Sequence, residues 1–397
     1  MIAGGTLASL VERAWTGGSP SARLVRAFLV PAAWLFGLIV RVRAGLYDAG
    51  LLRVGHAGVP VVSVGNLRVG GTGKTPLVIW LVEKLAALGM RPVVVARGYR
   101  GPTRDPVLIS TAARPATALP TPARGAAPRH VDLSAGDPWQ GEEAPAADEA
   151  LLVALRTGCP VVTAADRVLA CELAERAFAA DVIVLDDGFQ HRRLARDLDI
   201  VILAAGDRRA ALLPAGPLRE GPRALGRADI VLTDDPGAPD PRLVRCASGL
   251  VSEYRGFVAP LERLRGRGVV AVAGIARPER FFALIEEAGA HITQRLCFDD
   301  HHSYTARDWL RIAEAAGAAD LVVTTEKDLV KLRRHAGADA QLFALRLSVD
   351  VEDGETLLER VRALDAKHCG QHHPGELRGS GAQHAQPGRS GASGEVK

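Results

Sequence analysis

The chain has 397 residues, of which 48% are hydrophobic and 24% are charged, and these proportions exclude both a chain disordered throughout and a polytopic membrane protein. The formal net charge is +4, and residues 1–56 alone carry that excess, with six arginines against Glu12 and Asp48. Because the remaining residues are balanced and contain no RNA- or DNA-binding motif, no nucleic-acid partner is expected. The five cysteines include no C-x-x-C pair, which argues against a disulfide scaffold or a thiolate zinc site and favours a reducing cytoplasm.

An apolar run at 27–40, AFLVPAAWLFGLIV, lies between two arginines on each side. A helix of this length is about 21 Å long, short of a hydrocarbon core of about 30 Å, so the run is not expected to span a membrane. The arginines and Trp34 favour an element that lies in the cytoplasmic leaflet. Two alternatives stay open: core helices of the first domain, divided at Pro31 and Gly37, and a signal peptide, for which no convincing cleavage site follows.

Beyond this run, short β-branched segments alternate with helical patterns. Strands are predicted at 60–65, 92–97, near 161, and at 182–185, 200–203 and 230–233, with helices at 76–88, 148–157 and 166–180. Such alternation predicts a largely parallel sheet with helices on both faces. After a looser stretch at 251–265, a second alternation predicts strands at 269–272 and 321–325, with helices after Pro278, from the capping pattern at Thr305, and through Lys331.

A glycine-rich loop joins the first strand to the first helix. Its glycines let the backbone curl so that several N–H groups point at phosphate oxygens, while Lys74 can reach the β and γ phosphates and Thr75 can ligate Mg²⁺. The strict phosphate-loop pattern requires Gly at position 68, where this chain has Arg68, and a glycine-rich turn without nucleotide is the alternative. The predicted ATP-binding residues are Arg68, Val69, Gly70, Gly71, Thr72, Gly73, Lys74 and Thr75.

An acidic strand end follows about 110 residues later. Four apolar residues precede Asp186 and Asp187, whose carboxylates are expected to meet Mg²⁺ directly or through water. Gln190 and His191 come next and are expected in the crevice at the carboxyl ends of the strands, where ligands of open α/β sheets bind. A solvated loop is the alternative for this pair.

The patterns divide the chain into four parts. Residues 1–56 form an apolar and basic segment that associates with a membrane, 57–250 a phosphate-loop NTPase-like parallel-sheet domain, 251–365 a second, smaller α/β domain, and 366–397 a disordered tail. Within the first domain, 102–144 is rich in Ala, Pro, Thr and Arg and is expected to be a low-complexity insertion.

Eight segments resemble one known family, tetraacyldisaccharide 4'-kinase, the lipid A 4'-kinase of Gram-negative bacteria. They are SVGNLRVGGTGKTP at 63–76, ARGYRG at 96–101, DEALLVA at 148–154, DDGFQHRRLARD at 186–197, LPAGPLRE at 213–220, GIARPERFF at 274–282, DDHHSY at 299–304 and TEKDLVKL at 325–332. The resemblance implies ATP and Mg²⁺ as cofactors, with transfer of the γ-phosphoryl group to the 4'-hydroxyl of tetraacyldisaccharide 1-phosphate to give lipid IV-A. It also implies peripheral or monotopic attachment to the cytoplasmic face of the inner membrane. No protein partner is predicted.

The same resemblance suggests roles within the matching segments. Lys74 is expected to stabilise the transferring phosphoryl group, and Asp148 with His301 to accept the hydroxyl proton across a cleft between the domains. The predicted substrate-binding residues are Asn66, Arg97, Tyr99, Glu149, Gln190, His191 and Arg219. Arg167, Arg192 and Arg193 could hold phosphates or be structural. The chain departs from the family pattern at Arg68, at Ala147, where Gly is usual before the Asp-Glu pair, and in the longer 102–144 interval.

A membrane-bound regulatory ATPase that uses its nucleotide as a switch is the rival interpretation. Such proteins typically place Lys directly before the paired glycines, where this chain has Val69. A non-catalytic scaffold would leave the segments DDGFQH and DDHH without a role.

Overall fold

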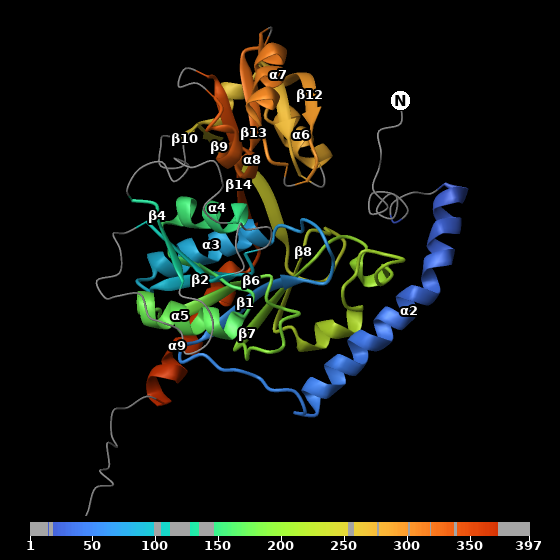
Figure 1. The fold of residues 1–397 in the computed structure, drawn as a ribbon, viewed down its shortest axis with the longest axis vertical. Helices are drawn as coiled ribbons and strands as arrows, with labels where there is room; N and C mark the ends of the chain where they lie inside the picture. Colours follow the sequence, from blue (N-terminus) through green and yellow to red (C-terminus); the bar gives the residue numbers. More distant parts are fainter. Residues whose placement is uncertain are drawn as a thin grey trace, which may run out of the picture.

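Two β-sheets organise the protein in this computed structural model, which describes residues 15, 19–98, 105–111, 128–134, 147–252, 258–275, 278–300, 302–317, 319–336 and 340–371. The first sheet has the strand order β4-β3-β5-β2-β6-β1-β7-β8 and the second the order β10-β9-β14-β13-β11-β12 (Figure 1). Helices cover both sheets, and one long helix near the N-terminus lies along the side of the first domain. The predicted α/β class, with a second domain and an N-terminal apolar helix, is confirmed.

The first sheet carries the core of the larger domain. Its strands are β1 (Val61–Asn66), β2 (Pro92–Ala96), β3 (Val107–Ser110), β4 (Arg129–Asp132), β5 (Val161–Thr163), β6 (Val182–Asp186), β7 (Leu198–Leu203) and β8 (Ile230–Thr233). Neighbouring strands are parallel except β3 and β5. Because β1 lies between β6 and β7, the residues that follow β1 and β6 meet at the carboxyl edge of the sheet.

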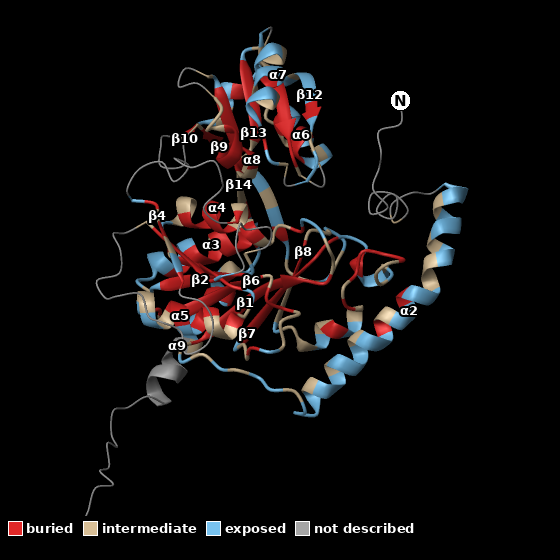
Figure 2. Cartoon of the chain, viewed as in Figure 1, coloured by how far each residue is buried: buried red, intermediate tan, exposed pale blue. Residues whose placement is uncertain are grey.

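Helices cover both faces of this sheet, as expected for parallel strands buried on both sides. On one face, α3 (Lys74–Ala87) and α4 (Asp148–Thr157) share an apolar core with the strands, and α5 (Arg167–Phe178) packs on the other face. Two short 3₁₀ helices, η1 (Asp207–Arg209) and η2 (Pro222–Arg227), lie between β7 and β8. Figure 2 shows the strands as a buried layer between these helices.

The second sheet is smaller and mixed. Its strands are β9 (Leu243–Val251), β10 (Val258–Ala259), β11 (Gly268–Ala273), β12 (His291–Cys297), β13 (Leu321–Thr325) and β14 (Leu342–Val351), with η3 (Leu261–Leu264) after β10. α6 (Pro278–Glu287) packs on one face, and α7 (Ala306–Ala316) with α8 (Glu326–Leu332) packs on the other. The predicted Thr305 capping box is present at the start of α7.

The predicted boundary at residue 250 and the end of the second domain at 365 differ from the structure. β9 pairs with β14 in antiparallel register over eight residue pairs, so β9 belongs to the second sheet. At one end of this ribbon Leu243 and Val351 are buried in the first core, and at the other Leu345 is buried in the second. α9 (Gly354–Gln371) then returns to the first core, because its apolar side chains pack beside α3. Its backbone also covers 366–371, the start of the predicted tail.

The 102–144 interval is not wholly the loose insertion that its composition predicted. Two pieces of it, 105–111 and 128–134, are described, and they supply β3 and β4 at one edge of the first sheet. Val107, Leu108 and Ile109 are buried there. Three consecutive apolar residues within a Pro- and Ala-rich stretch were enough to form a strand, because β5 offered an edge with which to pair.

The N-terminal helix is longer than the apolar run predicted. α2 (Pro20–Asp48) continues through Pro31 and has 29 residues, about 43 Å at 1.5 Å per residue, so the length argument against spanning is wrong. By length and composition it could cross a membrane. Most of its side chains are exposed, including Phe28 and Trp34, which contradicts the core-helix alternative. This exposed apolar surface suggests membrane association.

The packing of β3 gives a test of its place in the core. Replacing Ile109, which is fully buried, with Ala is expected to lower the free energy of unfolding by about 2–5 kcal/mol, since the cavity cannot be refilled by the flanking strands. Urea denaturation measures this change. Leu310→Ala on the exposed face of α7 is the control and is expected to stay within about 0.5 kcal/mol of the parent. An equally small effect at Ile109 would contradict the assignment.

Candidate active site

The glycine-rich loop lies where the sequence predicted it, between β1 and α3. Gly70 and Gly73 have φ angles of 95° and 90°, a region that side-chain-bearing residues rarely adopt. Lys74 and Thr75 are the first two residues of α3, so Lys74 starts at the positive end of the helix dipole. This arrangement of turn and helix N-terminus suits a bound phosphate chain.

Two of the predicted ATP-binding residues are engaged elsewhere. The guanidinium of Arg68 forms an ion pair with buried Asp207 of η1, with 3.2 Å between Nη1 and Oδ1. The backbone N–H of Val69 donates to the carbonyl oxygen of Pro217 at 2.9 Å. Both groups fasten the loop to the 206–218 segment, and their predicted role in binding ATP stays a prediction.

A polar network joins the loop to the end of β6. Arg219 donates two hydrogen bonds to the carboxylate of Asp187, at 2.7 and 2.8 Å, and a third to the side-chain oxygen of Asn66. The Nζ of Lys74 lies 3.5 Å from Asp187 Oδ1. Asn66 in turn donates to the hydroxyl of Thr72 at 2.8 Å. The loop, the strand end and the LPAGPLRE segment therefore form one hydrogen-bonded unit.

The two adjacent carboxylates have opposite electrostatic environments. Burial favours the neutral form of Asp187, but the hydrogen bonds from Arg219 and the charge of Lys74 outweigh it and hold the pKa of Asp187 well below its ordinary value. Burial, together with the charge of Glu149, raises the pKa of Asp186 to about 7. Of the two carboxylates, Asp186 is therefore the one whose ionised form gains most from a further cation.

The oxygen atoms that line this site are suitable ligands for a magnesium ion. Asp186 is 7% exposed, and its Oδ1 is buried without a hydrogen-bond partner in the described part of the chain. A hard cation would provide the missing partner for this oxygen. Thr75, in the first turn of α3, offers a hydroxyl as a further oxygen donor. Among the described residues there is no cluster of three His, Cys, Asp or Glu side chains that could hold a metal. Mg²⁺ does not need one, because it commonly binds one or two carboxylates together with substrate phosphates.

A second set of ion pairs crosses between the domains. Asp148 and Glu149 form the first turn of α4, and each pairs with a lysine of α8: Lys331 Nζ lies 3.1 Å from Asp148 Oδ2, and Lys327 binds Glu149. Farther along, the guanidinium of Arg156 lies 2.8 Å from the carboxylate of Glu326, the first residue of α8. These three α8 residues lie in the TEKDLVKL segment, but no role was predicted for them from the sequence.

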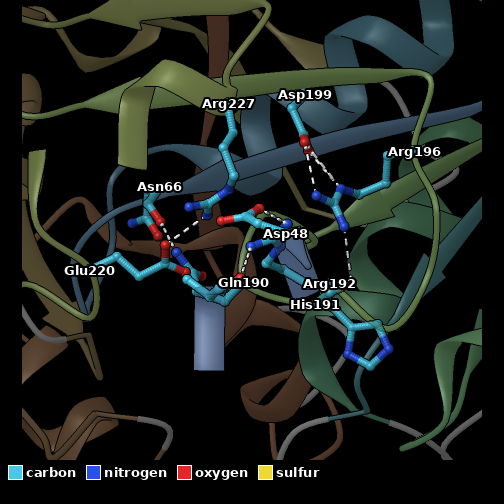
Figure 3. Close-up of polar contacts among 10 residues, drawn as sticks. Asp48, Asn66, Gln190, His191, Arg192, Arg196, Asp199, Glu220 and Arg227 are labelled. Atoms are coloured by element: carbon cyan, nitrogen blue, oxygen red, sulfur yellow. Dashed lines mark hydrogen bonds and ion pairs between the residues drawn. The ribbon is translucent and has the colours of Figure 1, made fainter. Parts of the chain in front are cut away.

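Several predicted substrate residues lie along the same edge of the sheet. Gln190 donates from Nε2 to the carbonyl oxygen of Asn66 at 2.8 Å, as Figure 3 shows. Arg97 is exposed just after β2. Tyr99 and His301 lie outside the described residues, so the predicted pairing of His301 with Asp148 stays a prediction.

The three arginines whose roles the sequence left open contact different parts of the protein. Arg192 binds the end of α2, donating to the carbonyl oxygen of Ala44 and to Asp48 at 2.9 and 2.7 Å (Figure 3), and its guanidinium lies 5.3 Å from the ring centroid of Tyr47. Arg193 lies 3.4 Å from Asp166 and is largely exposed. Arg167 is 3% exposed and interacts electrostatically with Asp186 and Asp187. Arg192 is therefore structural, whereas Arg167 places a buried cation near the acidic strand end.

His191 is held neutral by its surroundings. It is half-buried, and its Nε2 is buried without a hydrogen-bond partner among the described residues. Burial, reinforced by the charge of Arg167, lowers the pKa of His191 from 6.5 to about 4. Its ring points away from the neighbouring polar groups in Figure 3, while its carbonyl oxygen accepts from Arg196.

This shift predicts a pH dependence of stability. Between pH 6.5 and about 4 the unfolded chain binds a proton at His191 that the folded chain does not, so His191 destabilises the fold as pH falls through this range. His191→Gln is expected to show a smaller drop in Tm between pH 7 and pH 4 than the parent. The exposed His291→Gln on β12 is the control, with the parental slope expected. Parallel slopes for His191→Gln and the parent would contradict the neutral assignment.

Comparisons with known proteins agree with the family that the motifs predicted. The chain matches the family described as Tetraacyldisaccharide-1-P 4'-kinase over residues 25–119 and 124–364. Relatives named tetraacyldisaccharide 4'-kinase occur in Anaeromyxobacter sp., 38% identical over 90% of this chain and 96% of the relative, and in Halorhodospira halophila, 39% identical over 85% and 92%. Another, in Geobacter sulfurreducens, is 39% identical over 86% and 95%.

A solved structure is similar along nearly the whole fold. It is LpxK from Aquifex aeolicus, described as an "apo" form in complex with ATP, with a TM-score of 0.68 and 29% identity over 86% of this chain and 99% of that one. The sequence and structural matches therefore agree in extent, and the chain belongs to the tetraacyldisaccharide-1-P 4'-kinase family.

Proposed function

We propose that this protein is an ATP-dependent lipid kinase, which transfers the γ-phosphoryl group of ATP to the 4'-hydroxyl of tetraacyldisaccharide 1-phosphate and forms lipid IV-A. The observation that carries the proposal is the polar unit at the carboxyl edge of the first sheet, where Lys74 and Arg219 surround Asp187 beside the orphaned oxygen of Asp186. The identity of the lipid acceptor is inferred from membership of the family.

Phosphoryl transfer requires mainly positioning and charge neutralisation. Lys74 begins α3 within reach of the phosphates, and the amides of 70–75 offer donors to them. Mg²⁺, held by Thr75 with Asp186 and Asp187, would neutralise charge on the phosphate oxygens. Arg219 keeps Asp187 ionised and fixes the direction of its carboxylate.

The acceptor hydroxyl needs a base, and we propose that Asp148 accepts its proton together with His301. Asp148 lies at the N-terminus of α4, at the junction of the two domains, where it can face a substrate held between them. His301 is the proposed partner of Asp148, and a carboxylate that bonds an imidazole orients it and raises its basicity. Asn66, Arg97, Tyr99, Glu149, Gln190, His191 and Arg219 are the residues proposed to bind the substrate.

We propose attachment to the cytoplasmic face of the inner membrane through α2. Phe28 and Trp34 are 88% and 75% exposed on this helix, whose arginines include Arg41 and Arg43. Apolar side chains on such a helix enter the boundary between headgroups and acyl chains, while arginines attract anionic lipids. The end of α2 is bound by Arg192, so attachment would hold the catalytic domain at the surface that carries the lipid acceptor.

Transfer of label from ATP to the lipid tests the kinase assignment. Wild-type protein, incubated with γ-labelled ATP and tetraacyldisaccharide 1-phosphate, is expected to yield labelled lipid, and Lys74→Ala to lower kcat by about 10²-fold or more. Lys84→Ala, on the exposed side of the same helix, is the matched control with parental turnover. Near-normal turnover in Lys74→Ala would overturn the phosphate-loop assignment, and ATP hydrolysis without labelled lipid would favour the regulatory switch.

Sedimentation with vesicles tests the membrane assignment. In the full chain, the double variant Phe28→Ser, Trp34→Ser is expected to bind anionic phospholipid vesicles about tenfold or more weakly. The variant lacks the two large apolar side chains that move from water into the membrane when the parent binds. Leu310→Ser is the control, since Leu310 is 68% exposed but lies on the second domain. Equal binding by the double variant and the parent would remove α2 from the membrane interface.

A further inference from the structure

Two lysines of α8 reach from the second domain to the two acidic residues of α4. Lys327 and Lys331 are four residues apart and therefore share one face of the helix. Lys331 meets Asp148 and Lys327 meets Glu149, so the pairs run in register along the junction of the domains. The residues of one short helix thus contact both side chains that begin α4.

Lys331 is fixed by the core of its own domain. Its side chain is 8% exposed, and its Nζ lies 3.8 Å from the carboxylate of Asp328, which is fully buried. Asp328 accepts hydrogen bonds from the backbone N–H of Gly274 at 2.9 Å and from the hydroxyl of Thr325 at 2.7 Å. These anchors lie just beyond β11 and at the end of β13, so the position of the ammonium group is set by the second sheet.

Holding the helices together does not account for Lys331. Arg156 and Glu326 already form a buried ion pair between α4 and α8, with both side chains 7% exposed. Burying a further ammonium group costs desolvation that its Coulomb attraction only partly returns. Lys331 is therefore expected to fix the position of its partner Asp148 or to stabilise the negative charge of that carboxylate.

We propose that Lys331 is a positioning residue for phosphoryl transfer: from the second domain it holds the carboxylate of Asp148 in one orientation and keeps it ionised. The inference rests on the proposed function of Asp148 as the base. It makes the base competent only while α8 is docked against α4, so the reaction is linked to the junction of the domains.

Other charged and titratable groups surround this pair and enter any pH dependence. They are Glu149 and Arg156 on α4, Glu326, Lys327 and Asp328 on α8, Glu83 on α3, Asp186 at the end of β6, Asp300 after β12, and Tyr304, whose ring centroid lies 5.8 Å from Lys331 Nζ. Replacing Lys331 leaves all of them in place but removes a cation beside Asp328 as well as beside Asp148, so the Asp148→Asn background described below is needed to assign a change in the pH profile to Asp148.

The test compares Lys331→Met with Lys331→Arg and with the control Lys84→Met in the full chain. Lys331→Met is expected to lower kcat about tenfold while the KM for ATP changes less than about twofold. The acid limb of the kcat–pH profile is expected to move to higher pH, because losing a nearby cation raises a carboxylate pKa. Lys331→Arg keeps the charge, so its acid limb is expected at the parental pH and part of kcat is restored. Lys84→Met is expected to match the parent.

A double-mutant cycle separates this role from a structural one. In the background of Asp148→Asn, Lys331→Met is expected to cost less than about twofold further in kcat. An unshifted acid limb with parental kcat in Lys331→Met, or the same tenfold loss in both backgrounds, would overturn the proposal. If Lys331→Met does not fold, Lys331→Gln, which keeps a polar end for Asp328, carries the same expectations.

The base assignment fails separately, if Asp148→Asn alone retains normal kcat. The kinase assignment fails if wild-type protein labels no lipid. An inactive Asp148→Asn combined with a parental Lys331→Met would leave both of those standing and would refute the positioning role alone.

Discussion

A buried carboxylate at the end of β6 is the constraint around which the larger domain is arranged. Asp186 lies in the core, its neighbour Glu149 is also acidic, and burial raises its pKa to about 7. Such a group needs cations, and the chain brings them from distant segments: Lys74 from the glycine-rich loop and Lys327 from α8. Cations from the glycine-rich loop and from the second domain therefore lie close together at the acidic end of β6.

The antiparallel ribbon of β9 and β14 makes this convergence possible. One end of the ribbon is buried in the first core and the other in the second, so it is a shared structural element and not a free linker. Because α8 follows β13, the neighbour of β14, the ribbon also places α8 against α4. A shift of the ribbon would change the distance from Lys331 to Asp148, and it would also disturb the core contacts of Leu243, Val351 and Leu345.

The sequence predicted what depends on local pattern and missed what depends on partners. The loop before Lys74, the strand before Asp186 and the Thr305 cap follow from local residue order, and the family and fold that they indicated are confirmed. The ribbon was missed because alternating burial on β9 depends on pairing with a strand a hundred residues away. The engagement of Arg68 by Asp207 likewise arises from tertiary contact alone. The roles assigned to the site residues stay predictions.

One short segment after β6 connects three functions that the sequence presented separately. Asp187 joins the loop and Arg219, Gln190 bonds the end of β1, and Arg192 binds the end of α2, all within six residues. The same short stretch of backbone therefore carries the side chain that binds the end of α2 and the carboxylate at the acidic strand end. A few peptide units thus separate the residue that binds α2, a helix with many exposed apolar side chains, from the acidic strand end beside the glycine-rich loop.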